Sequence, residues 1–284
     1  MEAPQGDAWG ESASEYDSFE KKWHFYGTVA DATIAHLNIE ASSRVLELAC
    51  GTGACTLKLS RLARAGKVVA LDSSEGMLAV ARENASAAGA RNVTFVRGDA
   101  GEISGLLAGQ SFDFAVCNSA FWHFPEPERV LAGLSKLLSP SGEFALSIPF
   151  WVEGSAVARE AFRAKAREVL LAHGVSSEAL DDLSARRSRR EIDLPALFRS
   201  SGFRVESVPF DFRVSMESRV AWRRISMFSG DRREAWLPPG LDQATQSEVR
   251  TELDAWRKAN LRRDPTESRW RIYLGRRSEE PTIS

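Results

Sequence analysis

The chain has 284 residues, of which 43% are hydrophobic and 27% charged, a composition typical of a globular protein with a full apolar core. Its formal net charge of −2 gives no overall attraction to nucleic acid or anionic membrane, so neither partner is expected. The sequence has no apolar run long enough for a membrane span or a secretory leader, and its three cysteines lack disulfide-framework or metal-site spacing. These features predict a cytoplasmic protein with reduced thiols and no metal.

Residues 1–40 are predicted to form a loose tail, up to about residue 13, and then one helix. From Tyr16 to Leu37, apolar side chains recur at steps of three and four residues, which places them on one stripe of a helix.

The pattern around which the chain is organised is the apolar run 44–48, which stops at Gly51 and Gly53. A helix-like segment follows, so the run predicts a buried strand, a tight turn and a helix start. Glycines let the backbone bend sharply and let a ligand approach it closely. A second apolar run, 67–71, ends at Asp72, and a carboxylate at the tip of the neighbouring strand suits the two hydroxyls of a ribose. Together these features predict a nucleoside site.

The residues around the glycines indicate which nucleoside. A dinucleotide-binding turn has a third glycine where this chain has Thr56, and no lysine follows as in a phosphate-binding loop. The carboxylate of Glu47, just upstream, suits a cation better than a polyphosphate. S-adenosylmethionine carries an ammonium and a sulfonium but no phosphate, and it is therefore the predicted cofactor.

Further strands continue the alternation of strands and helices. This rhythm predicts a doubly wound, largely parallel α/β sheet, with ligands at the carboxyl ends of the strands. The additional strands are expected over 93–97, 112–117, 142–148 (after a turn over 139–142), 202–212 and 269–274.

Two helical patterns interrupt the sheet, over 151–191 and 217–264. They follow the fifth and sixth strands, so we expect them to form one cap above the carboxyl ends of the strands. The sheet-forming parts are then 41–150, 192–216 and 265–284.

The loop Glu47-Leu48-Ala49-Cys50-Gly51-Thr52-Gly53 resembles the first motif of the class I S-adenosylmethionine-dependent methyltransferases. The resemblance is to small-molecule enzymes of the ubiquinone and menaquinone biosynthesis type, although alanine stands at position 49 where the family usually has glycine. It is strong over about 40–150 and weaker in the last two strands, and the two insertions match no known pattern. It implies a Rossmann-like, seven-stranded mixed sheet with helical cap insertions, whose last two strands form an antiparallel hairpin.

The resemblance also implies a set of cofactor-binding residues. The glycine-rich loop with Glu47 would hold the amino-acid end, and Asp72 the ribose. Met77 and Asp99 would contact the adenine, Asn118 would face the methionyl part, and Tyr16 of the N-terminal helix would touch the ligand. The alternatives are ordinary structural roles: a helix cap for Asp72, a turn for Asp99, and packing for Met77 and Tyr16. The full implied set is Tyr16, Glu47, Ala49, Gly51, Gly53, Asp72, Ser73, Met77, Asp99, Ala100, Asn118 and Ser119.

Methyl transfer requires alignment and a dry site, and a base only when the acceptor must lose a proton. His123 is the one histidine at a strand end within the motif region and is the candidate general base. Its alternative role is packing against Trp122. Large apolar side chains at the same rim would wall a substrate pocket, or simply pack a lid on the domain. These rim residues are Phe121, Trp122, Phe124, Phe150 and Trp151.

The predicted function is transfer of a methyl group to an O, N or C nucleophile of a small, apolar or aromatic metabolite. A nucleic-acid methyltransferase is one alternative, but the segment Asn118-Ser119-Ala120-Phe121 lacks the two prolines typical of enzymes that act on exocyclic amines. A protein methyltransferase is another. A third is a methyltransferase fold that binds the cofactor without methyl transfer, in a cyclisation or as a binding partner. The oligomeric state is left open.

Overall fold

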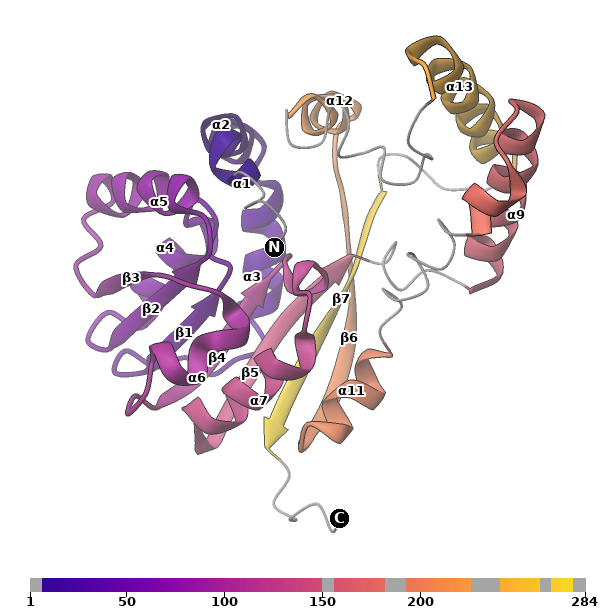
Figure 1. The fold of residues 1–284 in the computed structure, drawn as a ribbon. Helices are drawn as coiled ribbons and strands as arrows, with labels where there is room; N and C mark the ends of the chain where they lie inside the picture. Colours follow the sequence, from indigo (N-terminus) through magenta and orange to yellow (C-terminus); the bar gives the residue numbers. More distant parts are fainter. Residues whose placement is uncertain (1–6, 150–155, 182–192, 226–240, 261–266, 278–284) are drawn as a thin grey trace. The chain divides into compact units, whose positions relative to one another are not determined.

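The computed structural model describes residues 7–149, 156–181, 193–225, 241–260 and 267–277 (Figure 1). The chain divides into two compact units. The first, here called the sheet unit, comprises Met1–Val152, Leu194–Val214 and Ser268–Ser284. The second, here called the helical unit, comprises Glu153–Asp193 and Ser215–Glu267.

The sheet unit is built on one seven-stranded sheet of order β3-β2-β1-β4-β5-β7-β6. The first five strands in this order pair in parallel, and β7 runs antiparallel to β5 (Figure 1). This confirms the predicted mixed α/β sheet. The strands are β1 (Arg44–Leu48), β2 (Lys67–Asp72), β3 (Val93–Arg97), β4 (Phe112–Asn118), β5 (Leu138–Pro149), β6 (Phe203–Arg213) and β7 (Glu267–Arg277).

Strand β5 corrects one expectation. The segment 139–142, predicted as a turn before the strand, lies inside it. Leu138 pairs with Phe112, whereas the next partners along the two strands are Glu143 and Phe114, so the four intervening residues are taken up in a bulge. The Pro-Ser-Gly composition therefore marks an irregularity within a strand, not its boundary.

Helices cover both faces of this sheet because its strands are apolar on both sides. Ala145 joins a cluster with Ala30 and Ile34 of α3 (Phe25–Ile34) and Leu59 of α4 (Ala54–Leu62). Phe144, its neighbour in β5, points to the opposite face and meets Phe198 of α11 (Leu194–Ser200), with ring centroids 5.1 Å apart. The other helical segments of the sheet unit after β2 are α5 (Glu75–Ala87), η1 (Ala100–Glu102), α6 (Ile103–Leu106), η2 (Phe121–His123) and α7 (Pro127–Leu137).

The N-terminal region differs from the predicted tail and single helix. It forms α1 (Ala8–Glu11), α2 (Ala13–Trp23) and α3, so residues expected in the tail are helical. The long helix breaks at His24, whose backbone has a left-handed φ of 49°. The buried Glu20 carboxylate accepts hydrogen bonds of 2.8 Å from the backbone N–H groups of both Tyr26 and Gly27. The first backbone N–H groups of a helix have no partner within the helix, and Glu20 accepts from two of them at the start of α3. The apolar residues predicted on one helix are therefore divided between α2 and α3.

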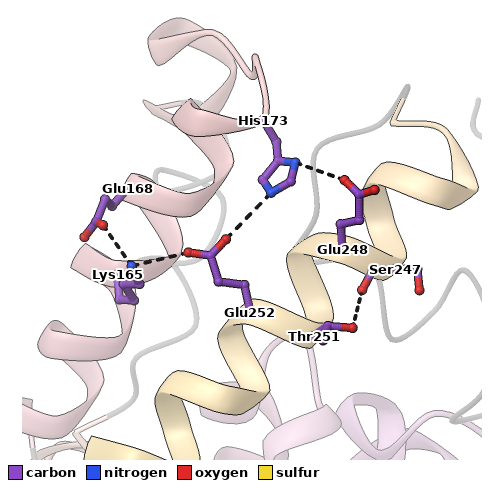
Figure 2. A network of polar contacts seen from close by, with 7 residues as sticks. All are labelled: Lys165, Glu168, His173, Ser247, Glu248, Thr251 and Glu252. Atoms are coloured by element: carbon purple, nitrogen blue, oxygen red, sulfur yellow. Dashed lines mark hydrogen bonds and ion pairs between the residues drawn. The ribbon is translucent and has the colours of Figure 1, made fainter.

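The helical unit contains α9 (Ala156–Ala172), α12 (Met216–Arg224) and α13 (Gln243–Asn260). Apolar side chains of α9 and α13, among them Val169 and Leu253, share a buried cluster. Figure 2 shows the polar contacts beside this cluster, in which the His173 imidazole lies between Glu248 and Glu252, with both nitrogen–oxygen distances at 3.7 Å. No helix within the described ranges has the length and apolar character to cross a membrane.

Candidate cofactor site

A cavity lies at the carboxyl ends of the parallel strands, where β2 and β4 flank β1 on opposite sides. Ligands of doubly wound sheets bind at such a switch point. The loops after β1, β2, β3 and β4 line the cavity together with α1, α2 and α5. Its lining residues are Trp9, Tyr16, Ala49, Gly51, Leu71, Asp72, Ser73, Met77, Gly98, Asp99, Ala100, Asn118, Ser119, Ala120, His123, Phe124 and Pro125.

The loop after β1 depends on left-handed backbone at three positions. Ala49, Gly51 and Gly53 have φ values of 52°, 56° and 91°. Glycine adopts this conformation without penalty, whereas the alanine pays a steric cost, which explains why the family usually has glycine at this position. A side-chain carbon added at Gly51 would meet no atom within 4 Å, so its backbone is open toward the cavity. Gly53 lies outside the lining and is the N-cap of α4.

Asp72 holds this loop and faces the cavity at the same time. Its Oδ2 atom accepts a hydrogen bond of 2.8 Å from Gly51 N, and its Oδ1 atom accepts one of 2.9 Å from Ser74 N. Burial raises the pKa of this carboxyl above its ordinary value, and the backbone hydrogen bonds oppose that shift. Each oxygen has a second lone pair that can accept from a ligand hydroxyl.

Glu47, predicted to hold the amino-acid end of the cofactor, does not line the cavity. Its side chain is buried, at 1% exposure, and accepts a hydrogen bond of 2.5 Å from Thr56 Oγ1. Burial raises the pKa of Glu47 to about 8, against the hydrogen bonds from Thr56 and Cys55. Glu47 therefore joins the end of β1 to the first turn of α4 beneath the loop.

Met77 and Asp99, predicted to contact the adenine, each have a role at a helix start and also line the cavity. Met77 is buried in the first turn of α5, where its backbone N–H donates to Ser74 Oγ over 3.1 Å. Asp99 caps η1, and its Oδ1 atom accepts from Gly101 N over 2.7 Å. Both reach the cavity wall with Ala100, so a structural role and a cofactor role are compatible for each residue.

The buried Ser147 of β5 forms hydrogen bonds with both Asn118 and Ser119. Ser147 Oγ donates to Asn118 Oδ1 over 3.0 Å, and Ser119 N donates to Ser147 Oγ over 3.0 Å. The amide of Asn118 also donates to the carbonyl of Tyr26 over 3.1 Å, which connects β4 with α3. Ser119 has a φ of 61°, so this network stabilises a strained backbone at the cavity wall.

His123 and Phe124 are the predicted acceptor-side residues that line the cavity. The exposed imidazole of His123 packs against two indoles, with centroid distances of 5.3 Å to Trp9 and 5.1 Å to Trp122. Trp122 lies outside the lining and contacts Trp270 at 6.3 Å. Phe121 is fully buried between Phe124 and Phe198, in the core. Phe150 and Trp151 lie outside the described residues.

Sequence reasoning missed Trp9, because it assigned residues up to about 13 to a loose tail. In the structure α1 carries Trp9 to the cavity, where its ring meets Tyr16 at 6.5 Å and His123 at 5.3 Å. The signal in the sequence is Asp7, whose carboxylate caps α1 by accepting from Gly10 N. Leu71, Gly98, Ala120 and Pro125 also line the cavity outside the predicted set.

Residues 39–179, about half of the chain, match the family described as "Methyltransferase domain". A demethylmenaquinone methyltransferase from Shouchella clausii is 32% identical over 112 residues, which are 39% of this chain and 47% of that protein. A trans-aconitate 2-methyltransferase from Deinococcus radiodurans is 37% identical over 107 residues, 38% of each protein. The chain thus spans about half or less of these two relatives. The chain belongs to the class I S-adenosylmethionine-dependent methyltransferases.

Further comparisons extend the similarity over more of the chain. An uncharacterised methyltransferase of Schizosaccharomyces pombe, C70.08c, is 27% identical over 206 residues, 71% of this chain and 73% of that protein. A putative methyltransferase from Bacillus halodurans has a TM-score of 0.56 at 16% identity, over 88% of this chain and 99% of that chain. The [4+2]-cyclase SpnF has a TM-score of 0.54 at 16% identity, over 89% of this chain and 81% of that chain. These structures show a shared fold, and the cyclase shows that the fold alone does not determine the reaction.

Proposed function

We propose that this methyltransferase transfers the methyl group of S-adenosylmethionine to an O, N or C atom of a small, largely apolar or aromatic metabolite. The observation that carries the proposal is one cavity in which Gly51, Asp72, Asp99 and Asn118 meet beside His123. The matches to enzymes named for demethylmenaquinone and trans-aconitate support a small-molecule acceptor.

The cavity fits the cofactor by its set of donors and acceptors. Asp72 presents acceptors for the ribose hydroxyls, and Asp99 presents one for the amino group of adenine. Gly51, with its open backbone, and Asn118 both line the cavity, which supports assigning them to the methionyl part. Among the described residues, no group of three or more His, Cys, Asp or Glu side chains is arranged to bind a metal.

When bound, S-adenosylmethionine supplies an electrophilic methyl carbon, and the chain supplies orientation and protection from water. Trp9, Tyr16 and Phe124 provide apolar and aromatic walls, which favour a dry site. In this proposal His123, which lines the cavity, accepts a proton from a hydroxyl or protonated amine of the acceptor at its ring nitrogen. An acceptor that needs no proton removal would leave His123 only the packing role already visible between Trp9 and Trp122.

The proposal includes a reducing, cytoplasmic setting. All three cysteines, Cys50, Cys55 and Cys117, are buried free thiols, and burial raises the pKa of each above its ordinary value. Such thiols are poorly reactive and are consistent with structural packing. Protein purified from cells can be treated with a thiol-labelling reagent and analysed by mass spectrometry. We expect none of the three cysteines to be oxidised, and we expect them to take up the label only after the protein is unfolded.

Incubation with S-adenosylmethionine and fractionated metabolite extracts tests the activity. Mass spectrometry should detect S-adenosylhomocysteine together with a product that is one methylene heavier than a small apolar metabolite. Cofactor binding by calorimetry without S-adenosylhomocysteine formation in any fraction would favour a binding or cyclisation role. Absence of cofactor binding would overturn the proposal.

A further inference from the structure

Asp7, the residue before α1, connects the N-terminal segment to the cofactor loops. Its Oδ1 atom accepts from Gly10 N over 2.9 Å, which caps α1. Its Oδ2 atom accepts from Ser74 Oγ over 2.9 Å and from Gly76 N over 3.3 Å, both at the start of α5. One carboxylate thus serves two helix starts that are more than sixty residues apart in the sequence.

The contact with Ser74 continues into the cavity. Ser74 N donates to Asp72 Oδ1, and Asp72 Oδ2 accepts from Gly51 N. Asp7, Ser74, Asp72 and Gly51 therefore form one continuous hydrogen-bond network from α1 to the loop after β1. A displacement of Asp7 would remove the partner of the Ser74 hydroxyl, next to the carboxylate assigned to the ribose.

The backbones of α1 and α5 also touch directly. A side-chain carbon placed on Gly76 would lie 2.4 Å from Cα of Gly10, so this close approach requires glycine at position 76. Trp9, in α1, lies in the sequence between the two residues that make these contacts, the N-cap Asp7 and Gly10, and it reaches the cavity wall. The position of the indole therefore depends on the contact between α1 and α5.

We propose that Asp7 is a positioning residue for the cofactor, acting as a latch that holds α1 on α5. In the closed latch, Trp9 forms part of the cavity wall and Ser74 is fixed beside Asp72, so opening of the latch speeds release of a bound cofactor. The inference rests on the proposed function, because it assumes that S-adenosylmethionine and its product occupy this cavity.

The latch joins α5 to a four-residue helix through the Asp7 carboxylate and the close approach of Gly10 to Gly76, and the ring contacts of Trp9 with Tyr16 and His123 also hold α1. Hydrogen bonds to the carboxylate lower the pKa of Asp7 below its ordinary value, although burial acts in the opposite direction. The positive charge of Arg97 also lowers this pKa. The ionised form therefore makes the closed contact, in which two backbone N–H groups and one hydroxyl donate to it.

Stopped-flow dissociation of S-adenosylhomocysteine tests the latch. Asp7→Asn keeps a capping acceptor for α1 but cannot accept at both oxygens, and Gly76→Ala forces the backbones apart without touching a carboxylate. We expect both variants to raise the dissociation rate about tenfold, because that factor corresponds to the loss of one hydrogen bond to a charged group. Glu75→Gln is the matched control, because it removes a carboxylate from the same helix start, where Glu75 pairs with Arg82 on the surface.

The outcomes separate the latch from the proposed function. Failure of the unmodified protein to bind S-adenosylhomocysteine would contradict the proposed function itself. If the unmodified protein binds S-adenosylhomocysteine and both variants release it as slowly as the unmodified protein does, Asp7 is not a positioning residue. A lower melting temperature with an unchanged dissociation rate would assign Asp7 to fold stability alone, which also overturns the inference.

Discussion

Asp72 uses its two oxygen atoms both to hold the cofactor loops and to face the cavity. Asp72→Ala should therefore weaken S-adenosylhomocysteine binding by about 10- to 100-fold, because charge-assisted hydrogen bonds are worth about 1.5–3 kcal/mol each. It should also lower the melting temperature, since Gly51 N and Ser74 N lose their partner. Calorimetry measures the affinity, and an unchanged value would refute the ribose assignment.

His123 has two possible roles that kinetics can separate. If it is the base, His123→Ala should lower kcat by about 10²- to 10⁴-fold with little change in cofactor affinity. The assay is initial-rate methyl transfer to the acceptor found in the metabolite screen, with Trp122→Phe as a control for lost packing. A near-native kcat would leave His123 as a packing residue between Trp9 and Trp122.

Glu47 should make the stability of the unliganded protein dependent on pH. Its pKa is about 8 in the fold, above the ordinary value of 4.5, so the folded state retains a proton that the unfolded state loses. Stability from this group is therefore present below about pH 4.5 and is lost as pH rises through about 8. In urea unfolding, the free energy of unfolding should decline less between about pH 4.5 and 8 for Glu47→Gln than for the unmodified protein. Equal slopes against pH for the two proteins would contradict the prediction.

At the scale of elements, the break between α2 and α3 depends on one buried carboxylate. Glu20→Ala should leave the backbone N–H groups of Tyr26 and Gly27 without their partner and cost about 1–3 kcal/mol of unfolding free energy. Urea denaturation measures this loss. Ser18→Ala, an exposed position on the same helix, is the control and should change stability little. Similar stability for both variants would show that the cap is dispensable.

At the scale of the whole molecule, the two insertions are predicted to form one cap above the carboxyl ends of the strands. The buried cluster shared by α9 and α13 supports their acting together. A cap in this position would exclude water from the reacting atoms. A crystal structure with S-adenosylhomocysteine tests the position, and packing of both insertions at the amino-terminal edge of the sheet would refute it.

The sequence by itself determined the order of strands and helices in the sheet unit and placed most of the cavity residues. Apolar runs report burial on both faces of a parallel sheet, and the glycines at 51 and 53 mark the turn that ends the first run. Parallel strands present their carboxyl ends at one edge of the sheet. The sequence alone therefore predicts that Asp72, Asp99 and Asn118 lie close together.

Only the tertiary structure decided which way the individual side chains turn and where distant segments meet. Glu47 turns inward to Thr56, Phe121 enters the core, and Trp9 reaches the cavity through contacts of Asp7 with α5. Each of these depends on a partner many residues away or on a single backbone angle, such as the left-handed φ of 49° at His24. Local periodicity reports which residues are apolar. It carries no information on long-range hydrogen bonds, and those bonds position the residues of this site.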